Sequence, residues 1–129
     1  MKKDFLYFFI ILIVVILAGF SFICWDIGIE VKSIAEEASQ KYPGDTVDAL
    51  IAFVDSKDNN TRRRNHAVWA LGQLGQKKAL PVLVKYYHGG PNDPTRELSQ
   101  YELKKAIKAC KGGLNLTAWT WRWYVNKAK

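Results

Sequence analysis

The pattern of hydrophobic and polar residues divides the chain into an apolar leader and a longer part in which apolar residues recur at helical spacing. No charged residue occurs among the nineteen residues from Phe5 to Ile23. At about 1.5 Å per residue, a helix of that length spans roughly 28 Å, close to the thickness of the hydrocarbon core of a bilayer. We therefore predict a transmembrane helix within residues 1–25, with lipid-facing residues that include Phe5, Leu12, Val15, Phe22 and Ile23.

The charges that flank this leader predict its orientation. Lys2 and Lys3 precede it, whereas residues 26–41 carry four acidic residues against two lysines. Because the positively charged flank of a membrane helix usually stays in the cytoplasm, we expect a cytoplasmic N-terminus and an extracytoplasmic C-terminal domain, as in a single-pass signal anchor. The alternative is a cleaved signal peptide, for which Gly19 and Ser21 would supply the small residues of the cleavage site.

The rest of the chain predicts an all-α fold. A juxtamembrane helix is expected within residues 26–44, and Asp45 is a suitable N-cap for the helix that follows. Apolar residues then return every three or four positions through four helical segments as far as residue 110. Gly75 is expected to end the second of these segments. We place the paired helices in residues 45–114 and a separate C-terminal segment in residues 115–129.

Two of these helices have a second copy further along the chain. The apolar residues at 49–51 match those at 82–84, an offset of 33, and those at 70–74 match those at 106–110, an offset of 36. A repeated helix pair with a period in the mid-thirties is typical of an α-solenoid. The sequence therefore predicts a short stack of about two helix pairs behind the membrane helix.

The segment from Arg62 to Gly75, RRRNHAVWALGQLG, resembles the second helix of bacterial HEAT repeats, related to the phycobilisome-lyase type. In that family the arginine at this position ties neighbouring repeats together, and small residues let two helices pack closely. The resemblance implies a HEAT-like solenoid, a protein-binding role and a bacterial cell or inner membrane. The residues that match the family signature are Arg63, Ala67, Ala70, Leu71, Gly72, Leu74 and Gly75.

Basic and aromatic residues dominate the end of the chain. The net charge is +7, which favours anionic partners, and no acidic residue follows Glu102. If the last segment is helical, Trp119 and Trp123 share a face that caps the solenoid, and Trp121 points away from it. Contact with anionic lipid headgroups is the alternative. Of the three consecutive arginines we expect Arg63 to be held structurally and its two neighbours to be solvated. Candidate contacts to a protein partner or to headgroups are Arg62, Arg64, Lys108, Lys111, Trp121, Arg122 and Lys127.

The sequence offers little chemistry for catalysis. His66 and His88 have no cysteine or carboxylate at the spacing of metal ligands. Cys110 lies on an apolar helix face, and we expect a buried thiol there, with a disulfide to Cys24 as the alternative. We therefore expect no catalytic residue, metal or cofactor, and no enzymatic activity. Nucleic acid is disfavoured as a partner, because the basic surface is expected outside the cytoplasm. The leading hypothesis is a membrane-anchored module that binds another protein.

Overall fold

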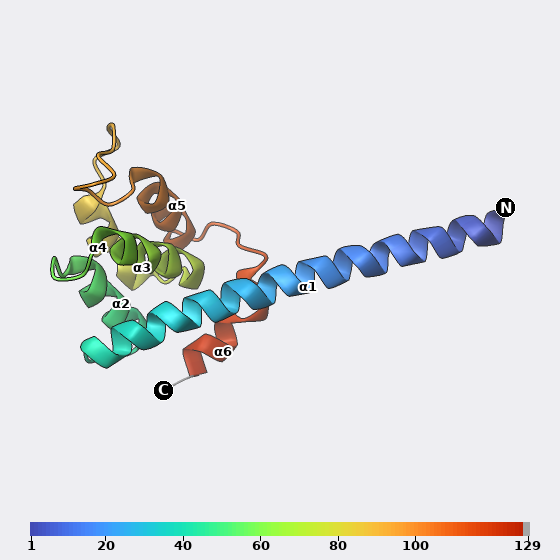
Figure 1. The fold of residues 1–129 in the computed structure, drawn as a ribbon, viewed down its shortest axis with the longest axis horizontal. Helices are drawn as coiled ribbons and strands as arrows, with labels where there is room; N and C mark the ends of the chain where they lie inside the picture. Colours follow the sequence, from blue (N-terminus) through green and yellow to red (C-terminus); the bar gives the residue numbers. More distant parts are fainter. Residues whose placement is uncertain (128–129) are drawn as a thin grey trace.

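The computed structural model describes residues 1–127, except for the side chains of Tyr124, Asn126 and Lys127. No strand occurs in this part of the chain, and the predicted all-helical fold is confirmed (Figure 1). The α-helices are α1 (Lys2–Lys41), α2 (Thr46–Asp55), α3 (Thr61–Leu74), α4 (Leu80–Tyr86), α5 (Gln100–Cys110) and α6 (Arg122–Lys127). Two short 3₁₀-helices, η1 (Lys77–Ala79) and η2 (Ala118–Thr120), precede α4 and α6.

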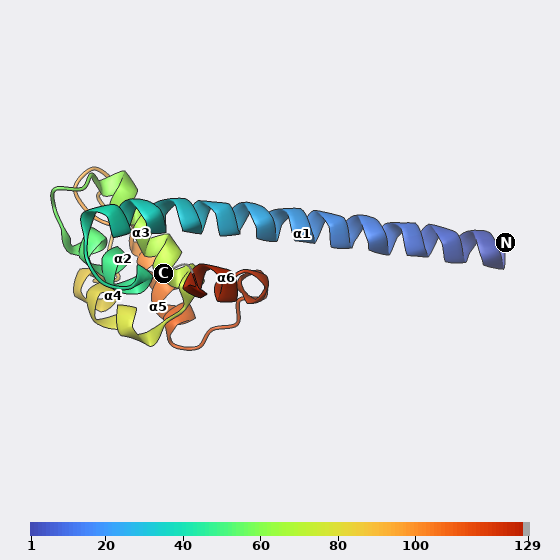
Figure 2. The ribbon, with the colours of Figure 1, turned by 90° about the horizontal axis from the view of Figure 1, so that it is seen from below.

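Helix α1 is unbroken, but its two halves have different surroundings. The N-terminal half projects away from the other helices, and its apolar side chains are exposed (Figures 1 and 2). Burial begins at Cys24 and continues through Val31, Ile34 and Ala38, which face the core. By length and composition this helix can cross a membrane: its most apolar 18-residue window has a mean hydropathy of 2.9, and no residue of that window is buried. A signal sequence near the N-terminus has the same properties.

The remaining helices stack beside the C-terminal half of α1. Helix α3 packs between α1 and α5, while α2 lies against both α1 and α3. Helix α4 lies against α5 and α2. The helix pairs α2–α3 and α4–α5 therefore follow one another in the manner of a solenoid, and α1 covers the first pair.

Local sequence signals account for several helix ends. The Asp45 carboxylate accepts hydrogen bonds from the backbone N–H groups of Val47 and Asp48, at 2.9 and 3.0 Å, so the predicted N-cap of α2 is confirmed. Gly75 has a left-handed backbone with φ of 63°, which confirms the predicted end of α3. The side chain of Asn60 caps the N-terminus of α3 by accepting from the Arg63 N–H at 2.8 Å.

The C-terminal segment closes the stack differently from the prediction. Trp121 is 7% exposed and packs against Gly28 of α1, whereas Trp119 and Trp123 are 83% and 61% exposed. The prediction that Trp119 and Trp123 pack on the solenoid while Trp121 points away is therefore wrong. Trp121 is not available as a surface contact. The reason is that residues 118–120 form a 3₁₀ turn and α6 begins only at Arg122, so a single helical face does not connect position 119 to position 123.

Candidate functional site

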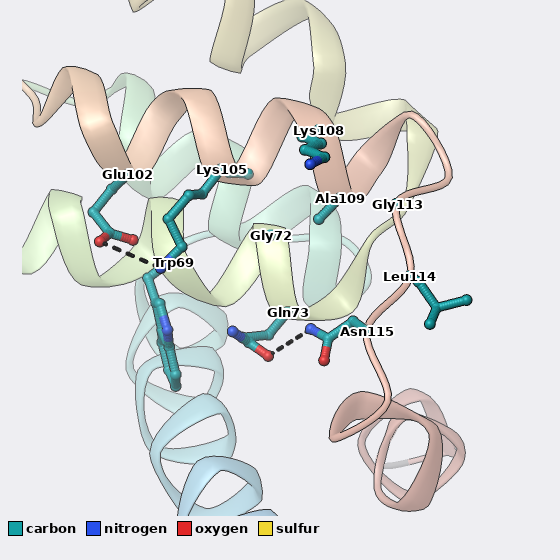
Figure 3. Close-up of a pocket in the computed structure, with 11 residues that line it drawn as sticks. Trp69, Gly72, Gln73, Glu102, Lys105, Lys108, Ala109, Gly113, Leu114 and Asn115 are labelled. Carbon is teal, nitrogen blue, oxygen red and sulfur yellow. Dashed lines mark hydrogen bonds and ion pairs between the residues drawn. The ribbon is translucent and has the colours of Figure 1, made fainter.

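A groove of about 530 Å³ lies along the junction of α3 and α5 (Figure 3). Helix α3 contributes the indole of Trp69 and the amide of Gln73, and α5 contributes Glu102 and Lys105. The side of the groove beyond the end of α5 is formed by the backbone and side chains of residues 113–115. The lining residues are Trp69, Gly72, Gln73, Glu102, Lys105, Ala106, Lys108, Ala109, Gly113, Leu114 and Asn115.

Gly72 sets the depth of this groove by allowing α3 and α5 to approach closely. A Cβ atom at position 72 would lie 2.9 Å from the Cα of Ala106, closer than carbon atoms normally approach. Trp69 and Gln73 are four residues apart and share one face of α3, next to Gly72 in the groove lining. Sequence reasoning missed these two residues as site residues, although their spacing of four around a small residue was the signal that pointed to a common face.

Polar contacts hold the far end of the groove in place. The Asn115 side-chain amide donates to the Gln73 Oε1 at 2.9 Å, a contact marked in Figure 3. The Arg122 Nε donates to the backbone carbonyl of Gln73 at 2.7 Å. On the α5 side, Lys105 lies 3.9 Å from Glu102. The groove thus offers an aromatic ring, side-chain amides and charges of both signs, which are groups that recognise a peptide through packing and hydrogen bonds.

A charged cluster ties α3 to α1 next to Trp69. The Arg63 guanidinium pairs with the Glu37 carboxylate of α1, and its Nη1 lies 3.2 Å from the Nδ1 of His66. The His66 ring is 5.3 Å from the ring of Trp69, and its Nε2 is 3.5 Å from a carboxylate oxygen of Glu30. Arg63 occupies the position that the HEAT resemblance associates with contacts between repeats.

These contacts shift the protonation equilibria of two groups in the cluster. The hydrogen bond from Arg63 lowers the pKa of Glu37, so this carboxylate stays ionised. Burial, together with the nearby Arg63 charge, lowers the pKa of His66 below its ordinary value of 6.5. The lowered pKa favours the neutral imidazole of His66, and the Arg63–Glu37 pair is the charged contact that joins α3 to α1 in this cluster.

The predicted contact residues have different surroundings. Arg64 is buried: its Nε donates to the Val54 carbonyl at 2.8 Å, and its guanidinium lies over the ring of Tyr86. The expectation that Arg64 is a solvated surface contact is wrong. The last turn of α2 presents the Val54 backbone carbonyl on that side of α3, and the Arg64 side chain binds it. Arg122 is partly buried on Gln73, while Arg62, Lys108 and Lys111 are exposed. The side chain of Lys127 lies outside the described residues.

Both cysteines are free and buried, which confirms a buried Cys110 thiol in place of a disulfide. The Cys110 Sγ lies 3.5 Å from the Leu71 carbonyl, and burial raises the pKa of this thiol to about 11. Within the part of the chain that the structure describes, no group of three or more histidine, cysteine, aspartate or glutamate side chains is placed to hold a metal ion.

Comparisons with known proteins identify the repeat and correct one expectation. The family model for HEAT repeats matches residues 30–104, which run from the C-terminal half of α1 into α5. Deoxyhypusine hydroxylase of Schizosaccharomyces pombe is 34% identical over 76 residues, which are 59% of this chain and 23% of that protein. The matched part of this chain thus spans about a quarter of the relative's length. Since the relative is named as an enzyme, the expectation of no enzymatic activity is contradicted. No solved structure matches the chain significantly.

Proposed function

The chain belongs to the HEAT-repeat family, and on that premise we propose that it is a protein-interaction module held at a membrane by the N-terminal half of α1. Stacked helix pairs present an extended surface on which partners bind. The observation that carries the proposal is the groove between α3 and α5, in which Gly72 lets the two helices approach closely and Trp69 forms one edge. The resemblance of residues 62–75 to the bacterial, phycobilisome-lyase type of repeat supports a bacterial setting within the same proposal.

The lining of the groove indicates what kind of segment it receives. Half-buried aromatic side chains such as Trp69 are the residues that most often anchor a protein partner. Lys105 and Lys108 are exposed at the edge and outnumber Glu102 there. We infer that the groove takes a short peptide segment that packs an apolar side chain on Trp69 and brings carboxylates to the two lysines.

The exposed apolar surface of α1 supports the proposed anchoring. An apolar half-helix that is exposed along its whole length is unfavourable in water and suited to lipid. Lys2 and Lys3, which begin α1 before its uncharged run, support a cytoplasmic N-terminus and an extracytoplasmic HEAT module. The topology is tested by fusing a reporter enzyme after Lys129. A reporter that works only outside the cytoplasm should show activity in this fusion. Activity only of a cytoplasmic reporter would reverse the proposed topology, and a mass that lacks the leader would indicate cleavage.

Photo-crosslinking in the membrane tests the proposed groove. A photoreactive amino acid placed at Gln73 or Lys105 in the full-length chain should give an adduct with the same partner protein from either position. Val84, exposed on α4 and outside the groove lining, is the matched control position and should not give this adduct. The adduct should also disappear when Trp69→Ala is added. Equal adducts from Gln73 and Val84, or none from either groove position, would reject the groove as the binding site.

The alternative of lipid-headgroup binding by a basic C-terminus has less support. Three of its candidate residues, Arg64, Trp121 and Arg122, have intramolecular roles in the fold. Lys108 and Lys111 remain exposed on and after α5. Each exposed lysine supplies only about 1 kcal/mol of electrostatic attraction to an anionic surface. We therefore place protein binding first.

A further inference from the structure

The segment after α5 exposes a cluster of large apolar side chains. Leu114, Leu116, Trp119 and Trp123 are 89%, 67%, 83% and 61% exposed, and we refer to these four residues as the C-terminal collar. All four line one groove of about 1000 Å³ in this segment. Such a concentration of exposed apolar groups is unusual on a surface that faces water and marks an interaction site.

The position of the collar along α1 suggests what covers it. Trp121, in the middle of the same segment, packs on Gly28, and both η2 and α6 contact α1. Gly28 lies three residues after Trp25, where the uncharged run ends. Figures 1 and 2 show the segment beside α1 where its apolar half leaves the other helices. Trp25, also strongly exposed, lies at this level of α1. The collar is thus beside the end of the proposed membrane span.

We propose that the C-terminal collar inserts into the interfacial zone of the bilayer, among headgroups and the first acyl carbons, and fixes the orientation of the HEAT module on the membrane. This inference rests on the proposed anchoring by α1. Tryptophan is enriched at this depth of a membrane, because its ring is apolar while its N–H is polar. Leucine side chains gain from the neighbouring hydrocarbon. A membrane is favoured as the occupant because the collar adjoins the exposed apolar half of α1.

Spin-label accessibility in the full-length chain tests the insertion. Single cysteines are placed at Val15, Leu116, Trp119 and Val84 in a Cys24→Ala, Cys110→Ala background and labelled with a nitroxide. The proteins are reconstituted into vesicles of phosphatidylcholine and phosphatidylglycerol. Oxygen is enriched in lipid, whereas a nickel chelate stays in water. Labels at Leu116 and Trp119 should therefore collide more often with oxygen than with the chelate, as the label at Val15 should. Val84 lies outside the C-terminal collar and outside the apolar half of α1. Its label should therefore collide more often with the nickel chelate than with oxygen.

Each outcome decides a separate point. Nickel-accessible labels at Leu116 and Trp119, with Val15 in lipid, would overturn the collar and leave the anchor intact. A nickel-accessible Val15 would remove the anchor and the collar with it. Labels shielded from both reagents would indicate a protein partner or a second copy at this surface. Loss of the oxygen preference in high salt would show electrostatic attachment and contradict apolar insertion.

A second measurement avoids the cysteine background. Brominated lipids quench tryptophan fluorescence over short distances, and part of the emission of the unmodified chain should be quenched. The Trp119→Phe, Trp123→Phe variant should lose part of that quenching, because only two collar rings are replaced and Trp25 remains. A Trp69→Phe variant is the matched control and should lose none, since Trp69 lies in the other groove. Equal quenching of the unmodified chain and the collar variant would overturn the inference.

Discussion

Replacing Gly72 with alanine tests whether the close approach of α3 and α5 shapes the groove. The new Cβ would lie 2.9 Å from the Cα and 3.0 Å from the Cβ of Ala106. Carbon atoms pack best at about 3.5–4.0 Å, so the helices must separate by roughly 0.6 Å. No change of rotamer relieves this contact, because the nearest atom of Ala106 belongs to its backbone.

Two effects of opposite sign set the size of the change. Overpacking of a well-packed core typically costs about 1–3 kcal/mol. Alanine is also the better helix former, which returns about 1 kcal/mol at an interior helix position. The expected net result for Gly72→Ala is a loss of about 1 kcal/mol in the free energy of unfolding. For a domain of this size, that loss lowers the melting temperature by roughly 4–8 °C.

Thermal unfolding of the full-length chain in detergent micelles measures this loss, with tryptophan fluorescence as the signal because Trp69 lies at the groove. Gly19→Ala is the control, since nothing lies within 4 Å of a Cβ at that position. It should not lower the melting temperature. Adding Ala106→Gly to Gly72→Ala should restore only part of the stability, because the Ala106 Cα remains in the way. A Gly72→Ala protein as stable as the original would refute the argument.

Three further predictions concern the surroundings of α3. Arg64→Leu should lower the free energy of unfolding in urea by about 1–3 kcal/mol, since it leaves the Val54 carbonyl without its donor; the exposed Arg62→Leu control should stay within about 0.5 kcal/mol. The Cys110 thiol should resist an aqueous thiol reagent in the folded chain, because burial raises its pKa to about 11, and should react after unfolding; rapid labelling of the folded chain would contradict its burial. The pKa of Glu37 is lowered in the fold, so its pairing with Arg63 stabilises the protein above the ordinary carboxyl pKa of 4.5 and is lost as the pH falls through the lower, folded pKa. Melting curves between pH 7 and acid should therefore show a steeper loss for the unmodified chain than for Glu37→Gln, and parallel curves would show that the pair contributes nothing.

Features that depend on neighbours in the sequence were predictable. The Asp45 cap and the Gly75 stop each follow from the backbone geometry of a helix end, which involves residues two to four positions away. The apolar face of α3 follows from spacing alone, and its residues are buried as expected. The close packing at Gly72 was also implied, because a small residue in the middle of an apolar face permits two helices to approach.

Features that depend on where another helix ends were not predictable. Three consecutive arginines point in three directions, and sequence does not show which one meets the last turn of α2, where Val54 presents a carbonyl. The burial of Trp121 depends on the path of residues 112–121, which form loop, turns and the 3₁₀-helix η2 and not a continuous α-helix. The groove likewise forms only when residues 113–115 return to α3, and that contact depends on one pair of amide side chains.

The two apolar surfaces of the molecule are linked through the same short segment. Gly113, Leu114 and Asn115 line both the groove between α3 and α5 and the groove of the C-terminal collar. Because α1 is continuous from Lys2 to Lys41, the half that packs against α3 cannot turn independently of the half that projects away from the other helices. If the collar lies at the bilayer surface, one end of the binding groove is therefore within a few residues of that surface. On the proposal that this groove binds a protein, we infer that its partner segment would be the membrane-proximal part of another membrane protein, for which the shared membrane would raise the effective concentration.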